Sequence, residues 1–93
     1  MHRRGRVDTN QTEIVKALRS IGATVAVTSS LGNGFPDLVV GWQGKNYLFE
    51  VKDGTLPPSR TRLTPDEQRW HDSWRGHVVT IYSADDALEV LGT

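Results

Sequence analysis

Two short apolar segments separated by three residues constrain the fold of this 93-residue chain more than any other feature. Residues 37–42 and 46–52 both contain the β-branched and aromatic side chains that favour strands. Only Gln43-Gly44-Lys45 connects them, and so short a connection requires an antiparallel hairpin. We therefore expect a sheet built around this hairpin.

The segment before the hairpin has the spacing of an amphipathic helix followed by a strand. Over residues 10–21, Ile14, Leu18 and Ile21 recur on one helical face. Residues 24–28 are rich in β-branched side chains, which favour extended backbone. A helix and one strand are therefore expected before the hairpin.

After the hairpin, the strongest local signal is a helix cap. Thr64 and, three residues later, Glu67 form the capping-box pattern, so a helix is expected over residues 65–75. A strand over residues 78–82 and a short helix over residues 84–91 follow. The predicted order is α-β-β-β-α-β-α, which indicates an α/β domain with a mixed four-stranded sheet.

The composition is that of one globular domain. The chain is 37% hydrophobic and 24% charged, and the absence of cysteine excludes disulfides and thiolate metal sites. No apolar run approaches the roughly 18 residues of a membrane span, and no secretory signal is recognisable. We expect a cytoplasmic protein without a membrane partner, folded over residues 9–93 and preceded by a flexible basic arm over residues 1–8.

Three charged residues meet at the open end of the predicted hairpin. Glu50 and Lys52 point to one face of their strand, and Asp37 on the facing strand lies opposite residue 51 to within one position. Two carboxylates at such spacing can bind one Mg²⁺ ion, which lowers the pKa of bound water. The lysine adds positive charge where the transition state of phosphodiester hydrolysis becomes more negative. The set is sufficient for metal-dependent hydrolysis of a phosphodiester.

The alternative is a solvated Asp, Glu and Lys at an exposed hairpin end, because short patterns of this kind are frequent by chance. Two features favour a site. The apolar residues 38–40 and 47–49 indicate core strands, and the preceding loop over residues 29–34 is rich in glycine.

Three motifs in series resemble a known nuclease superfamily. They are residues 34–40 (Gly-Phe-Pro-Asp-Leu-Val-Val), residues 48–52 (Leu-Phe-Glu-Val-Lys) and residues 63–68 (Leu-Thr-Pro-Asp-Glu-Gln) with Trp70. The series resembles the PD-(D/E)XK nucleases, and more closely the VRR-NUC branch, known from stand-alone phage proteins and as a domain of DNA-repair nucleases. The resemblance covers residues 13 to about 82. It implies a restriction-endonuclease-like core of order α-β-β-β-α-β and, for a phage-encoded chain, the host cytoplasm.

The resemblance also implies a Mg²⁺ or Mn²⁺ centre and a catalytic lysine. Lys52 would be catalytic, and Gln68 would reach it or a phosphate from the second long helix. The implied metal ligands are Asp37, Glu50, the backbone carbonyl of Val51 and, often through water, Glu13. From the residues alone, Glu13 could instead be an exposed acid paired with Lys16, and Gln68 an ordinary polar residue of an amphipathic helix.

Basic residues outside this set could contact a phosphate backbone. The net charge of zero does not favour nucleic-acid binding, but five Lys/Arg against two acids in the first 19 residues are compatible with one basic face. Arg3, Arg4 and Arg6 could contact nucleic acid, with a solvated tail as the alternative. Arg60 and Arg62 could do the same, with a solvated loop as the alternative.

Trp70 and Trp74 share one side of the second long helix at i and i+4. Such a pair is usually part of a core, but a dimer interface or a surface on which bases stack would also use it. His71 and His77 lack zinc-ligand spacing and are expected at the surface.

These features predict a metal-dependent endonuclease that acts on DNA, on branched or otherwise structured substrates such as Holliday-like junctions, as a homodimer without an organic cofactor. The alternatives are a non-catalytic nucleic-acid-binding module on the same fold and an interaction domain that dimerises through Trp70 and Trp74. A dependence on metal would distinguish the endonuclease from both alternatives.

Overall fold

The predicted hairpin is the centre of the sheet in the computed structural model, which describes residues 9–93. Strand β2 (Leu38–Trp42) pairs antiparallel with β3 (Lys45–Val51). The connection has two residues rather than three, because Lys45 already pairs with Trp42. Gln43 and Gly44 both have positive φ angles, 51° and 80°, which is the backbone of a tight hairpin turn that follows the twist of the strands.

The two remaining strands complete a mixed sheet of order β1-β2-β3-β4. Strand β1 (Thr24–Val27) pairs antiparallel with β2, and β4 (Val79–Ile81) pairs parallel with β3. A parallel neighbour requires a long crossover, and the chain supplies it between residues 52 and 78. The predicted α/β order and the mixed four-stranded sheet are confirmed, with one added 3₁₀ turn at Pro58–Arg60.

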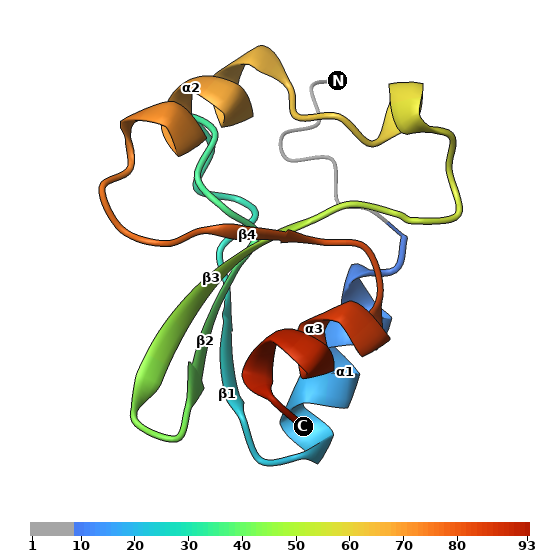
Figure 1. Cartoon of the computed structure of the whole chain (residues 1–93), viewed down its shortest axis with the longest axis vertical. Helices are drawn as coiled ribbons and strands as arrows, with labels where there is room; N and C mark the ends of the chain where they lie inside the picture. The colour runs from blue at the N-terminus through green and yellow to red at the C-terminus, as the bar shows by residue number, and fades with distance from the viewer. Residues whose placement is uncertain (1–8) are drawn as a thin grey trace.

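Helices α1 (Gln11–Ser20) and α3 (Ala84–Leu91) pack side by side on one face of the sheet (Figure 1). Alternate strand residues point toward these helices and are buried with the helical stripes. The core contains Ile14, Val15, Leu18, Ala23, Leu38, Val40, Phe49, Val51, Ile81, Ala87 and Leu91. No helix within residues 9–93 is long and apolar enough to cross a membrane.

Helix α2 (Pro65–Ser73) lies apart from this core, over the end of the sheet where β2 begins and β3 ends (Figure 1). The predicted capping box is present, because the Thr64 hydroxyl accepts from the Glu67 N–H and the Glu67 carboxylate accepts from the Thr64 N–H. The helix ends at Ser73, two residues earlier than predicted, because Trp74 is extended.

The loop between β1 and β2 fixes the position of α2. Gly34 has a φ of 80°, and a Cβ atom there would lie 2.2 Å from the backbone oxygen of Asp66. Only glycine allows this approach. The loop that leads into Asp37 is thereby held against the first turn of α2.

Candidate active site

Asp37 is held by backbone bonds at the point where the chain enters β2. Its N–H donates to the Phe49 carbonyl over 3.0 Å, and its Oδ2 accepts from the Val51 N–H over 2.8 Å. The sheet register pairs Leu38 with Phe49, so one further step places Asp37 opposite Glu50. This agrees with the predicted pairing to within one residue.

Glu50 is a buried acid beside Asp37. Its side chain points away from the helical core, and only 1% of the residue is exposed. Burial first, and then the negative charges of Asp37 and Glu67, raise its pKa to about 10. Burial also raises the pKa of Asp37, although the hydrogen bond from Val51 opposes that shift. The metal-free Glu50 carboxyl is therefore neutral near pH 7 and shares a hydrogen bond with Asp37.

Lys52 completes the cluster from the end of β3 and is 9% exposed. Its Nζ lies 2.8 Å from Oε1 of Glu67 and 3.9 Å from Oε2 of Glu50. Its backbone is fixed as well, because its N–H donates to the Ile81 carbonyl and its carbonyl accepts from the Asn10 amide. The ammonium group therefore has a defined position beside the two acids.

Glu67 is the member of the cluster that the family resemblance did not assign. It was predicted only as a capping residue, yet its Oε1 accepts from both the Thr64 N–H and the Lys52 ammonium. Burial alone would raise its pKa, but these donors outweigh burial and lower it. The capping box was the available signal, because a carboxylate at that position folds back over the helix start.

The structure does not bring Gln68 or Glu13 into this cluster. Gln68 is exposed and its amide donates to Asp72 over 2.9 Å, because one helical position turns it about 100° from Glu67. Glu13 is exposed on α1, whose buried stripe begins at Gln11. Neither residue is among the groups that shift the pKa of Asp37 or Glu50.

The donor set fits a hard divalent cation held by few protein ligands. Within the described residues, Oε1 of Glu50 is buried and accepts no hydrogen bond from an N–H or hydroxyl donor. The Glu50 carboxyl lies beside other carboxyl groups of the cluster and Lys52. The carbonyl of Val51 points the same way as its N–H, which contacts Asp37. No group of three or more His, Cys, Asp or Glu side chains within residues 9–93 is arranged to bind a metal. Mg²⁺ commonly uses one or two carboxylates and keeps several waters, so the set of Asp37, Glu50 and the Val51 carbonyl is adequate.

Trp70 of α2 and Trp74, the residue directly after the helix, contact each other. Their rings stack with centroids 4.6 Å apart and planes inclined by 19°, and Phe35 meets Trp70 edge-on at 5.3 Å. Trp74 remains 43% exposed. His77 is exposed as predicted, whereas His71 is half-buried against Trp70, and burial lowers its pKa.

The predicted phosphate contacts divide into two groups. Arg60 and Arg62 are exposed on the loop between β3 and α2, where solvent or a ligand can reach them. The predictions for Arg3, Arg4 and Arg6, and for the arm they belong to, concern residues outside those that the structure describes.

No family model, curated protein or solved structure matches the chain. The family resemblance therefore rests on the motifs alone.

Proposed function

We propose that this protein is a metal-dependent endonuclease that hydrolyses phosphodiester bonds in DNA. One observation carries the proposal: Asp37 and Glu50 touch, and Lys52 lies beside them in the same buried cluster. A fold rarely buries an acid and a lysine beside a second, half-buried acid without a functional reason, because the desolvation of charge is costly. The motif series that resembles PD-(D/E)XK nucleases supports the same reaction.

Each residue of the cluster has a distinct role in the proposed reaction. Asp37 and Glu50 would hold Mg²⁺ or Mn²⁺, and the hydrogen bond from the Val51 N–H fixes the Asp37 carboxylate for that purpose. The bound cation would polarise the phosphoryl oxygen and lower the pKa of a coordinated water. Lys52 places its ammonium where the phosphoryl group gains negative charge, and Glu67 keeps that ammonium in position.

Branched or otherwise structured DNA is the proposed substrate, and a homodimer is the proposed assembly. Both proposals come from the family resemblance, because cleavage of a junction needs two active sites acting on two strands. Arg60 and Arg62 are exposed and would contribute phosphate contacts. The 43% exposed ring of Trp74 would lie between the two copies.

Cleavage assays with matched variants test the proposal. Branched, single-stranded and duplex DNA are each incubated with Mg²⁺, Mn²⁺ or EDTA. Cleavage in either metal and none in EDTA is expected. Asp37→Asn should abolish cleavage and metal binding by calorimetry, whereas Asp85→Asn, an exposed acid on α3, should preserve both. Metal binding that is equal in both variants would remove Asp37 from the site.

Non-catalytic nucleic-acid binding is the second candidate, and two observations favour it over catalysis. The described residues offer no group of three acidic or imidazole ligands, and Lys52 already has the Glu67 carboxylate as a partner. This function predicts nucleic-acid affinity that is unchanged by EDTA and no cleavage of any substrate by the wild type. An interaction domain would show neither affinity nor cleavage.

A further inference from the structure

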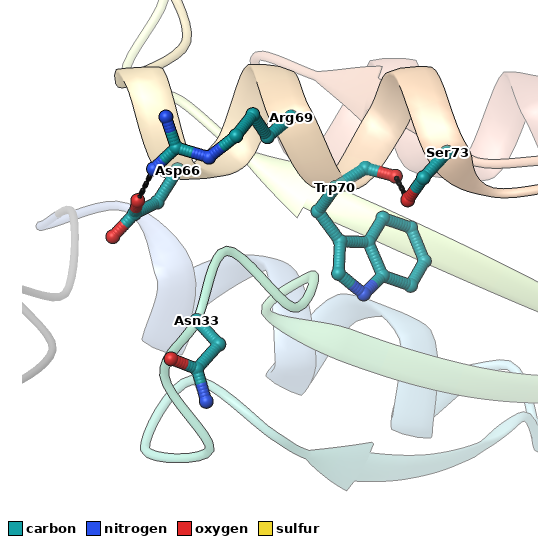
Figure 2. Close-up of a pocket in the computed structure, with 5 residues that line it drawn as sticks. All are labelled: Asn33, Asp66, Arg69, Trp70 and Ser73. Carbon is teal, nitrogen blue, oxygen red and sulfur yellow. Dashed lines mark hydrogen bonds and ion pairs between the residues drawn. The ribbon is translucent and has the colours of Figure 1, made fainter.

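A pocket separate from the acidic cluster lies between α2 and the loop that precedes β2. Its volume is about 460 Å³, within the range of small-molecule sites. Figure 2 shows Asn33 on the loop and the other lining residues on α2. The lining residues are Asn33, Asp66, Arg69, Trp70 and Ser73.

The walls of this pocket are held in place without a ligand. Asn33 has a φ of 55° in a turn that Gly34 fastens to α2, and its exposed side chain lies at the edge of the pocket (Figure 2). Trp70 stacks on Trp74, and Phe35 contacts it with the two ring planes 73° apart. A ligand entering here would meet a preformed surface, which lowers the entropic cost of binding.

The chemistry of the walls matches a nucleobase better than a phosphate. The indole of Trp70 has one face against Trp74 and lines the pocket with an apolar ring, and the exposed Asn33 side chain carries a donor and an acceptor that the edge of a base can meet. Asp66, which pairs with Arg69, adds an acceptor that a phosphate would avoid and an exocyclic amine would use. Arg69 remains largely exposed beside it and can reach a neighbouring phosphate.

The pocket is close to the proposed catalytic lysine. Trp70 follows Glu67 by three residues, about 4.5 Å along the helix axis, and Glu67 contacts Lys52. Side chains three positions apart are neighbours on a helix surface. A nucleotide next to the phosphate at Lys52 would therefore have its base within reach of this pocket.

We propose that this pocket binds one unpaired nucleobase adjacent to the bond that is cut, so that the enzyme selects DNA with an unpaired nucleotide at the cleavage position. The inference rests on the proposed nuclease function and specifies its substrate. A base stacked and paired inside a duplex cannot enter such a pocket, whereas a base at a branch point, gap or bulge can.

The test compares two DNA duplexes that differ by one unpaired nucleotide, with 2-aminopurine at that position. Binding is measured in Ca²⁺, and stacking on Trp70 is followed as quenching of 2-aminopurine fluorescence. Wild type is expected to bind the unpaired substrate at least about tenfold more tightly and to quench its fluorescence, since one good base contact contributes about that much discrimination.

Asn33→Gly is the decisive variant, because glycine tolerates the φ of 55° and only the amide is lost. It should reduce the preference about tenfold, and Trp70→Leu should remove the quenching. Lys45→Ala, an exposed change at the opposite end of the hairpin, should leave both unchanged. If Trp70→Leu does not fold, the base preference of Asn33→Gly still tests the inference.

Equal binding of the two duplexes by wild type, or a full preference in Asn33→Gly, would overturn the inference. If the variants change sedimentation but not base preference, the pocket belongs to a contact between copies, and the inference is also overturned. A base preference without cleavage in Mg²⁺ or Mn²⁺ would reject the nuclease and leave a binding module. Cleavage without the preference would reject only the pocket.

Discussion

The Nζ of Lys52 and the N–H of Thr64 both donate to the same oxygen, Oε1 of Glu67, at 2.8 and 2.9 Å. The side chain that caps α2 is thus also the carboxylate that holds the proposed catalytic lysine. The Glu67 carboxylate therefore connects the start of α2 to the end of β3. Displacing either element would move the ammonium away from Asp37 and Glu50.

Two substitutions of Glu67 separate its roles. Glu67→Gln can still cap the helix, since Gln also forms a capping box, but it removes the charge beside Lys52. Glu67→Ala removes both the helix cap and the charge, and Lys52 then loses the carboxylate that lies 2.8 Å from its Nζ. We therefore expect a loss of about 3 kcal/mol in the free energy of unfolding. The loss of unfolding free energy should be smaller for Glu67→Gln than for Glu67→Ala, by about 1 kcal/mol or more, because the glutamine keeps the cap.

Urea denaturation measures these changes, and Asp66→Asn is the control. Asp66 lies in the same helical turn but pairs with Arg69, so its substitution should cost no more than about 1 kcal/mol. If Glu67→Ala is as stable as this control, the contact between Glu67 and Lys52 does not stabilise the fold.

The raised pKa of Glu50 predicts a stability that falls with pH in the absence of metal. Its ordinary pKa of 4.5 rises to about 10, so between these values the folded state binds a proton that the unfolded state releases. Stability is then fully present below pH 4.5 and decreases as pH rises toward 10, by at most about 1.4 kcal/mol per pH unit. The raised pKa of Asp37 acts in the same direction.

Thermal denaturation between about pH 7 and 9.5 measures this slope. This range avoids His71, whose lowered pKa gives a slope of opposite sign below about pH 6.5. Glu50→Gln should flatten the curve, and Glu89→Gln, on the exposed face of α3, should retain it. Saturating Mg²⁺ should also reverse the slope, because the cation requires the charged carboxylate. A wild-type stability that rises with pH in EDTA would contradict the assignment.

Much of the fold could be predicted because local signals agreed with the tertiary arrangement. The short connection around Gly44 required the hairpin, and the capping pattern at Thr64 identified the start of α2. The juxtaposition of Asp37, Glu50 and Lys52 then followed from strand alternation and register. These are relations over a few residues or across one turn.

The fourth member of the cluster could not be assigned in the same way. Which of Glu67 and Gln68 faces Lys52 depends on how α2 is rotated above the sheet. That rotation is set by the contact between Gly34 and Asp66, a long-range approach that no periodicity reveals. Likewise, no local signal marks the early end of α2 at Ser73, where the extended Trp74 stacks its ring on Trp70.

Homodimerisation predicts a concentration-dependent sedimentation coefficient. At micromolar concentration the wild type should sediment as a dimer. Trp74→Ala should shift it toward monomer, because a 43% exposed indole would be uncovered in the free chain and buried in the dimer. Tyr82→Ala, which also removes an exposed aromatic ring but one that follows β4, should remain dimeric. A wild type that stays monomeric while it cuts a junction would reject both the dimer and the two-site cleavage.

Lys52 distinguishes an enzyme from a binder most directly. Its ammonium lies 3.9 Å from Glu50 and is held by Glu67, so it can stabilise charge that appears only in the transition state. Such an interaction affects the rate and not the ground-state affinity. Lys52→Ala should therefore lose at least about a hundredfold in single-turnover cleavage at saturating enzyme, comparable to the loss of one oxyanion donor. DNA affinity in Ca²⁺ should change by no more than several-fold.

Lys52→Arg tests whether charge alone is sufficient. The planar guanidinium presents its charge differently from a compact ammonium, and the 9% exposed site leaves little room for it, so cleavage should recover only in part. Lys45→Ala, an exposed lysine on the same strand, should cut at the wild-type rate. Circular dichroism must first show that each variant is folded, because Lys52 is also an ion-pair partner of Glu67. Wild-type cleavage by a folded Lys52→Ala would place the catalytic centre elsewhere, since no other residue of this cluster carries a positive charge.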